Sequence, residues 1–220
     1  MARTAASMPR WSRLTTHRLL TYLGGCVVFS TGAYLFIHSD LGTDPLDVFA
    51  LGLLRHVPLT VGIAQGLIAA VCILVRAAWY RRRPVLMPFA TFFLCGSLID
   101  LLLFLEPARF LPLPAPATML LATMLCAYAS SLIIMSGIGI RAMDLVAIAM
   151  TEKWGWPFWI AKMSMEGVLL LSGYLMGGPV GVGTLCFLLV VDTLIQPFLR
   201  VNERVLRMPN LGMPSIQKVP

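Results

Sequence analysis

Glu166 and Lys162 are the residues of this chain whose types and spacing point most directly to chemistry. Glu166 lies near the middle of an apolar run over residues 158–176, where an ionised carboxylate is costly and usually has a function. Lys162 precedes it by four positions, so on a helix the two side chains share a face and can form an ion pair. Two interpretations stay open: a neutral or paired glutamate that holds helices together, or a site for a coupling proton or a substrate.

A second acidic group stands in the segment Asp44-Pro45-Leu46-Asp47, which has the features of a helix start. Asp44 can act as the N-cap, proline suits the first helical position, and Asp47 falls where a negative charge favours the helix dipole. The segment is therefore either a capped short helix at the membrane interface or a half-helix whose free N–H groups line a polar cavity.

Further acidic residues stand in or beside other apolar runs. Asp100 and Asp192 occupy related positions in two of the runs, and Asp192 lies deeper and needs a partner. Asp144 follows Arg141 at the start of another short apolar segment. The candidate substrate- or proton-binding residues are Asp47, Asp144, Glu166, Asp192 and Lys162.

Patterns typical of enzymes and metal sites are missing from the sequence. It contains no HExxH motif, no Gly-x-Ser-x-Gly motif and no Walker loop, and none of its three histidines lies deep in an apolar run. The five cysteines form no CxxC pair and all stand in apolar runs, which favours a packing role. We expect a protein that is not an enzyme and that has no metal site and no cofactor.

The composition indicates the environment in which these residues must be positioned. Hydrophobic residues make up 58% of the 220 residues and charged residues only 12%, against about a quarter charged in an average soluble domain. A soluble domain of this size could not bury such an excess, whereas lipid can cover it. The net charge of +7 comes from the tails and one loop, without aromatic interleaving, so we expect no nucleic acid partner.

Six apolar runs are long enough to cross the hydrocarbon core as helices. They cover about residues 19–37, 60–80, 85–105, 117–138, 158–176 and 180–199. Two shorter apolar segments, within 44–55 and 142–153, are too short to span and either lie at the interface or dip into the membrane. The sequence predicts an all-α, polytopic transmembrane helix bundle of about six spanning helices plus two short interfacial or re-entrant helices.

The basic residues predict the orientation of this bundle. Residues 1–17 form a basic tail, Arg81-Arg82-Arg83 follow the second run, and residues 201–220 form another tail. Lysine and arginine favour the cytoplasmic side, so both termini are expected in the cytoplasm. A single transmembrane domain then covers residues 18–200.

The two halves of the chain resemble each other. When the chain is aligned with itself at a shift of 97 positions, several Gly and Asp residues coincide. Two unrelated apolar stretches often match by chance at Leu, Ile and Val, but less often at Gly and Asp. We interpret this as a duplication, with repeat 1 over about 18–105 and repeat 2 over about 115–200. Three spans per unit would place the copies in opposite orientation, an inverted 3+3 repeat of the kind seen in secondary transporters. The matching pairs include Ser39/Ser136, Gly42/Gly139, Asp47/Asp144, Ala50/Ala147 and Ala64/Ala161.

Three segments also resemble a known family. They are Leu41-Gly42-Thr43-Asp44-Pro45-Leu46-Asp47, Arg81-Arg82-Arg83-Pro84 and the run Gly177-Gly178-Pro179-Val180-Gly181-Val182-Gly183-Thr184. Together they are similar to the YczE/YyaS/YitT family of bacterial polytopic membrane proteins, over about residues 19–200. The resemblance implies a multi-pass protein of the bacterial cytoplasmic membrane. Because that family has no established activity, it supplies no catalytic residues.

Two functions are compatible with these features. The first is a small-solute transporter or permease component with a site between the two repeats, which would bind a small molecule or an ion. The second is a non-transporting accessory or scaffold protein that binds another membrane or cytoplasmic component. Small-residue patches such as Gly24-Gly25, Gly32 and Gly62-x-x-x-Gly66 permit close helix approach, so a homo-oligomer or a membrane partner stays open as well.

Overall fold

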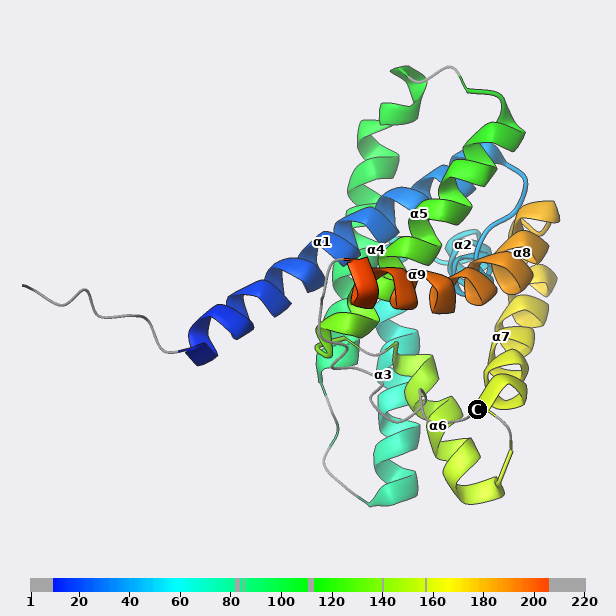
Figure 1. Ribbon diagram of the computed structural model, residues 1–220. Helices are drawn as coiled ribbons and strands as arrows, with labels where there is room; N and C mark the ends of the chain where they lie inside the picture. The colour runs from blue at the N-terminus through cyan, green and yellow to red at the C-terminus, as the bar shows by residue number, and fades with distance from the viewer. Residues whose placement is uncertain are drawn as a thin grey trace, which may run out of the picture.

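The chain folds as a bundle of helices (Figure 1). The structure is a computed structural model that describes residues 10–81, 84, 86–110, 113–139, 141–156 and 158–205; the side chains of residues 10–15, 144, 148, 158 and 159 are not described. In chain order the elements are α1 (Arg10–Ser39), α2 (Pro45–Leu54), α3 (Val61–Tyr80), α4 (Met87–Leu105), a 3-10 turn (Pro107–Phe110), α5 (Ala115–Ser136), α6 (Ala142–Trp154), α7 (Phe158–Leu175), α8 (Val182–Cys186), a π-helical turn (Phe187–Val191) and α9 (Asp192–Val205).

Five helices in the described part of the chain are long and apolar enough to cross a membrane. They cover Thr16–Ser39, Val61–Tyr80, Met87–Leu105, Ala115–Ser136 and the continuous helix Val182–Val205. This confirms five of the six predicted spans. The sixth prediction corresponds to α7, which is helical over 18 residues but is not among these five. Its sequence includes Lys162 and Glu166, whose charges lower the mean hydropathy of the helix.

The two short predicted segments are helices that lie inside the protein. In α2 the Asp44 side chain caps the first turn by accepting a hydrogen bond from Leu46 N at 2.9 Å, and proline starts the helix as expected. Most of α2 and of the described side chains of α6 are buried. Helix α2 packs against α7 and α3, and α6 packs against α3 and α7. Both helices are packed by their neighbours over most of their length, whereas the last turn of α6, with Glu152, Lys153 and Trp154, is exposed. The choice between an interfacial and an inward-dipping placement stays a prediction.

Helices α1 and α5 form the central contact of the bundle. Two glycines of α1 permit their close approach. A Cβ atom on Gly25 would lie 2.8 Å from the Ile133 side chain, and one on Gly32 would lie 2.6 Å from Cys126 Sγ and 3.1 Å from Ala122 O. These distances are shorter than van der Waals contact, so a larger residue at either position would force α1 and α5 apart.

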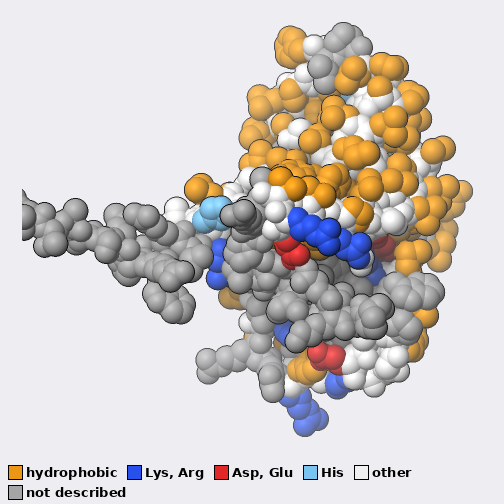
Figure 2. Space-filling model, viewed as in Figure 1, with side chains coloured by type: hydrophobic (Ala, Val, Ile, Leu, Met, Phe, Trp, Pro, Cys, Tyr) orange, Lys and Arg blue, Asp and Glu red, His pale blue; other side chains and the backbone are white. Residues whose placement is uncertain are grey.

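The outward faces of the long helices are apolar. Large exposed hydrophobic side chains stand on α3, α4, α5 and the 182–205 helix, among them Leu67, Phe93, Leu120, Leu185 and Leu189. Figure 2 shows hydrophobic side chains over the upper part of one face, with the described Lys and Arg side chains below them. A soluble protein rarely exposes so much continuous apolar surface, so lipid contact accounts for these faces.

The helices extend beyond the boundaries that we expected for the transmembrane domain. Helix α1 begins at Arg10, within the segment assigned to the basic tail, and α9 continues to Val205. Residues 10–22 contain no glycine or proline, and extending a formed helix costs far less than nucleating one. Arg82 and Arg83 of the predicted cytoplasmic loop lie outside the described residues.

Candidate functional site

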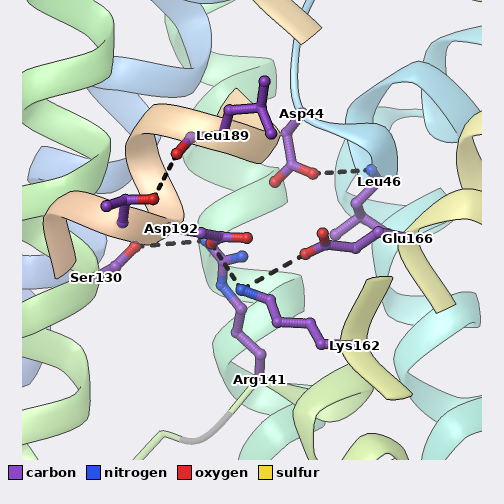
Figure 3. Close-up of polar contacts among 9 residues, drawn as sticks. Asp44, Leu46, Ser130, Arg141, Lys162, Glu166, Leu189 and Asp192 are labelled. Carbon is purple, nitrogen blue, oxygen red and sulfur yellow. Dashed lines mark hydrogen bonds and ion pairs between the residues drawn. The ribbon is translucent and has the colours of Figure 1, made fainter. Parts of the chain in front are cut away.

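Charged side chains from four separate parts of the chain converge inside the bundle. Asp44 comes from the start of α2, Arg141 from the residue before α6, Lys162 and Glu166 from α7, and Asp192 from the start of α9. Figure 3 shows their charged ends pointing toward a common space between the helices. We call these five residues the charged cluster. Asp44 and Glu166 are almost fully buried, at 4% and 1% exposed.

Lys162 connects two carboxylates of the charged cluster (Figure 3). Its Nζ donates a hydrogen bond to Asp192 Oδ1 at 2.6 Å and lies 3.6 Å from Glu166 Oε1. The first distance is that of a strong charge-assisted hydrogen bond, whereas the second is an ion pair without a hydrogen bond. The ion pair expected from the four-residue spacing is therefore present, and Asp192 has the partner that it needs.

A local irregularity of the helix precedes Asp192. Residues Phe187–Val191 form a π-helical turn, and Asp192 is the first residue after it. Thr193 Oγ1 donates to Leu189 O at 2.6 Å across this turn. A π-helical turn rotates the residues that follow it relative to a regular helix, and such turns often occur at functional sites. The irregularity thus determines the direction in which Asp192 points.

Arg141 and Asp44 occupy equivalent places at the starts of the two short helices. Arg141 makes no capping hydrogen bond with its side chain. Its guanidinium instead lies over the rings of Phe29 and Phe187, with Cζ 4.9 and 5.8 Å from their centroids, and donates to Ser130 Oγ at 3.4 Å. It also interacts electrostatically with Asp44. Aromatic faces stabilise a partly desolvated cation, so Arg141 keeps a positive charge inside the bundle.

Asp47 extends the polar region one turn further along α2. Its side chain is 1% exposed, and its Oδ1 accepts a hydrogen bond from Gln65 Nε2 of α3 at 2.6 Å. Its Oδ2 and the neighbouring Thr43 Oγ1 are both buried without a hydrogen-bond partner. Asp47 interacts electrostatically with Asp44 and Arg141, so it belongs to the same polar region as the charged cluster.

Four of the five predicted site residues therefore lie in or next to the charged cluster: Asp47, Lys162, Glu166 and Asp192. Asp144 lies on α6, three residues after Arg141, but its side chain is outside the described part.

Asp100 lies apart from the charged cluster and has a structural role. Its Oδ1 and Oδ2 accept hydrogen bonds at 2.8 Å from the backbone N–H groups of Val61 and Gly62 at the start of α3. It therefore caps α3 from the neighbouring helix α4.

Arg141 and Gln65 were not among the predicted site residues. Aligning the two halves already sets Arg141 opposite Asp44, and this pairing of opposite charges could have identified Arg141. Gln65 is a polar residue in an apolar run, but nothing in the sequence assigns Asp47 as its partner.

The arrangement has the properties of a binding site for a small charged or polar solute. It offers carboxylates and two cations in a partly buried region, where electrostatic interactions are stronger than in water. Among the described residues, no group of three or more His, Cys, Asp and Glu side chains could hold a metal ion.

Comparison with known proteins gives relatives but no activity. The chain is 27% identical over 176 residues to the uncharacterized membrane protein YczE of Bacillus subtilis (strain 168), which covers 80% of this chain and 82% of that protein. It is 26% identical over 188 residues to the uncharacterized protein YyaS of the same bacterium, covering 82% and 91%. An uncharacterized protein of Haemophilus influenzae is 24% identical over 194 residues, covering 83% of each chain.

No solved structure matches the chain. The match to YczE and YyaS confirms the resemblance seen in the sequence, and together with the helices described above it identifies a multi-pass membrane protein with bacterial relatives. A model described as "Family of unknown function (DUF6198)" matches residues 16–200, and the chain belongs to that family.

Proposed function

We propose that this protein is a small-solute transporter or permease component whose site is the charged cluster. The observation that carries the proposal is the convergence of the buried carboxyl groups Asp44 and Glu166 with two half-buried cations, between helices of the two halves of the chain. Ionisable side chains within membrane bundles are costly and mark substrate and ion pathways. A purely structural bundle of this size could hold its helices together with apolar packing alone.

The arrangement of the helices supports an inverted repeat around this site. Helix α1 packs against α5, its counterpart in the second half, and α2 packs against α7 just as α6 packs against α3. Ser39 and Ser136, 97 positions apart, make the same local bonds: each hydroxyl donates to the carbonyl three residues earlier and accepts from the N–H two residues later. Transporters with inverted repeats place the starts of interrupted helices at the substrate site, and here the residues that start α2 and α6, Asp44 and Arg141, belong to the charged cluster.

The proposal includes α7 as a sixth span. Its 18 residues reach about 27 Å at 1.5 Å per residue, close to the thickness of the hydrocarbon core. Lys162 and Glu166 point into the charged cluster and not toward lipid, so the charges that lower its mean hydropathy do not oppose insertion. Six spans would put both termini on one side, and the basic residues favour the cytoplasm for that side.

A flux measurement on the reconstituted protein tests the proposal. Proteoliposomes containing the full chain are screened for uptake of radiolabelled small charged and polar solutes, with and without a proton gradient. We expect uptake of at least one solute by the native chain and by Glu106→Gln, whose carboxylate pairs with Arg109 at the surface. Uptake should be lost in Glu166→Gln. The absence of flux for every solute, or equal flux in Glu166→Gln, would contradict the proposed site.

The accessory-protein hypothesis has less support from the packing. Of the glycines that motivated it, Gly25 and Gly32 contact α5, while Gly62 and Gly66 contact α4, so these patches are used within the chain. Gly24 is the exception, with nothing within 4 Å of a Cβ placed on it. A null flux screen together with a stoichiometric partner after purification would favour the accessory function.

A further inference from the structure

The polar region contains more acidic than basic groups. Asp44, Asp47, Glu166 and Asp192 contribute four carboxyl groups, whereas Arg141 and Lys162 contribute two cations. Full ionisation of these six groups would leave an excess of two negative charges inside the bundle. A net charge buried in apolar surroundings is too costly to persist, so additional positive charge must enter the region.

The geometry indicates which two carboxyl groups are left unmatched. Lys162 donates a hydrogen bond to Asp192 and stays 3.6 Å from Glu166, an ion pair without a hydrogen bond. Arg141 interacts electrostatically with Asp44. Glu166 is 1% exposed, and neither of its oxygens has a hydrogen-bond partner. Native proteins leave few buried polar atoms unpaired, so this carboxyl group points to a bound species that completes it.

Asp47 is the second unmatched group. Gln65 satisfies its Oδ1 at 2.6 Å, whereas Oδ2 and the nearby Thr43 Oγ1 are both buried without partners. A carboxylate can only accept hydrogen bonds, but a protonated carboxyl group gains one donor. A hydrogen bond from the Thr43 hydroxyl to Oδ2 would satisfy both atoms, but only a proton on Asp47 removes its buried negative charge.

We propose that solute movement through this site is coupled to protons, and that Glu166 and Asp47 are the groups that bind and release them. The proposal rests on the transport function proposed above and names its coupling ion. One proton on each group removes the excess of two negative charges. On Glu166 the proton also gives the carboxyl group a hydrogen-bond donor of its own. Lys162 can then stay paired with Asp192.

The surroundings of each group provide the means to release the proton. Glu166 faces Lys162 on its own helix, Asp192 on α9, Asp44 before α2 and Arg141 before α6. Asp47 faces Asp44, Arg141 and the neutral Gln65. A cation that moves toward either carboxyl group favours its ionised form, so a shift of Lys162 from Asp192 toward Glu166 would expel the proton from Glu166.

Infrared spectroscopy of the full chain in lipid nanodiscs tests the proposal without knowledge of the solute. Protonated carboxyl groups give a C=O stretching band that carboxylates lack, and its intensity is followed during a pH titration. We expect two titrating components in the native protein, one lost in Glu166→Gln and the other in Asp47→Asn. Glu166→Asp, which keeps the carboxyl group, should shift its component instead of removing it. Two exposed controls, Glu106→Gln and Asp40→Asn, should change neither component.

Three results would overturn the proposal. The first is a native spectrum with no titrating carboxyl band, and the second is a band in both Glu166→Gln and Asp47→Asn that is unchanged from the native protein. The third is loss of the band when Na⁺ or K⁺ is added at constant pH. The last result would identify an alkali cation as the bound species. The infrared result and the flux screen fail independently. Titrating bands without any flux would support the proton sites but refute transport. Flux that does not depend on a proton gradient would refute only the coupling.

Discussion

Replacing Lys162 by methionine is the perturbation that most sharply examines the charged cluster. The substitution keeps the length and the apolar stem of the side chain but removes the charge. Asp192 then loses a hydrogen bond of 2.6 Å and Glu166 loses its nearest cation at 3.6 Å. The Asp192 carboxylate, only 20% exposed, is left without its partner, and Glu166, 1% exposed, loses the cation that would favour its ionised form.

The expected loss of stability follows from the burial of this pair. Removing one partner of a buried ion pair costs roughly 3–5 kcal/mol, because the other charge stays desolvated. In a chain of 150–250 residues each kcal/mol lowers the midpoint of thermal unfolding by about 2–4 °C. Lys162→Met should therefore lower the midpoint by roughly 6–20 °C, measured in lipid nanodiscs by intrinsic fluorescence.

Two comparisons make this prediction specific. The double variant Lys162→Met/Asp192→Asn should be more stable than Lys162→Met alone, because no carboxylate is then left at position 192. Arg109→Met breaks an exposed ion pair with Glu106 and should cost less than about 1 kcal/mol. The reasoning is refuted if Lys162→Met is as mild as Arg109→Met, or if the second substitution adds to the damage.

Three further predictions concern the framework around the site. Gly42 has φ of 103°, and a Cβ on it would lie 2.6 Å from Gly181 N. Thermal unfolding should therefore show that Gly42→Ala destabilises the fold by at least about 2 kcal/mol. In the same assay Gly24→Ala, in open space, should be neutral or slightly stabilising. Asp100→Ala should cost about 1–2 kcal/mol through loss of the α3 cap but leave flux unchanged, and a loss of flux at unchanged stability would contradict that role. Ser7→Cys should react with an impermeant maleimide only in inverted vesicles and Arg109→Cys only in intact cells, and the reverse pattern would refute the topology.

The fold could be predicted from the sequence where one physical cause dominates. Long apolar runs require lipid, so five of the six predicted spans were found close to their expected bounds. The Asp44-Pro45 helix start was also correct, because capping depends on neighbouring residues alone. The start of α1 at Arg10 was not predicted. The polar composition of residues 1–17 indicates that they are in contact with water, but it does not determine where the helix begins.

The site could be predicted only in part. Glu166 and Asp192 were identified because a carboxyl group in an apolar run is conspicuous whatever surrounds it. The partners were harder to predict: the contact between Lys162 and Asp192 spans 30 positions and that between Gln65 and Asp47 links two helices, so both depend on packing. The π-helical turn before Asp192 left no recognisable signature in the sequence Phe187–Val191.

Access of water-borne reagents to the charged cluster from both sides of the membrane tests the central claim most directly. Ser130 lies beside Arg141, and Ser130→Cys can be probed with a small, permanently charged thiol reagent in intact cells and in inverted vesicles. Ser30→Cys is the matched control, because Ser30 is equally buried but bonds to Cys95 O between α1 and α4. A transport site predicts labelling of Ser130→Cys from both faces, above that of the native chain and of Ser30→Cys. Labelling from one face only, or from neither, would contradict the account.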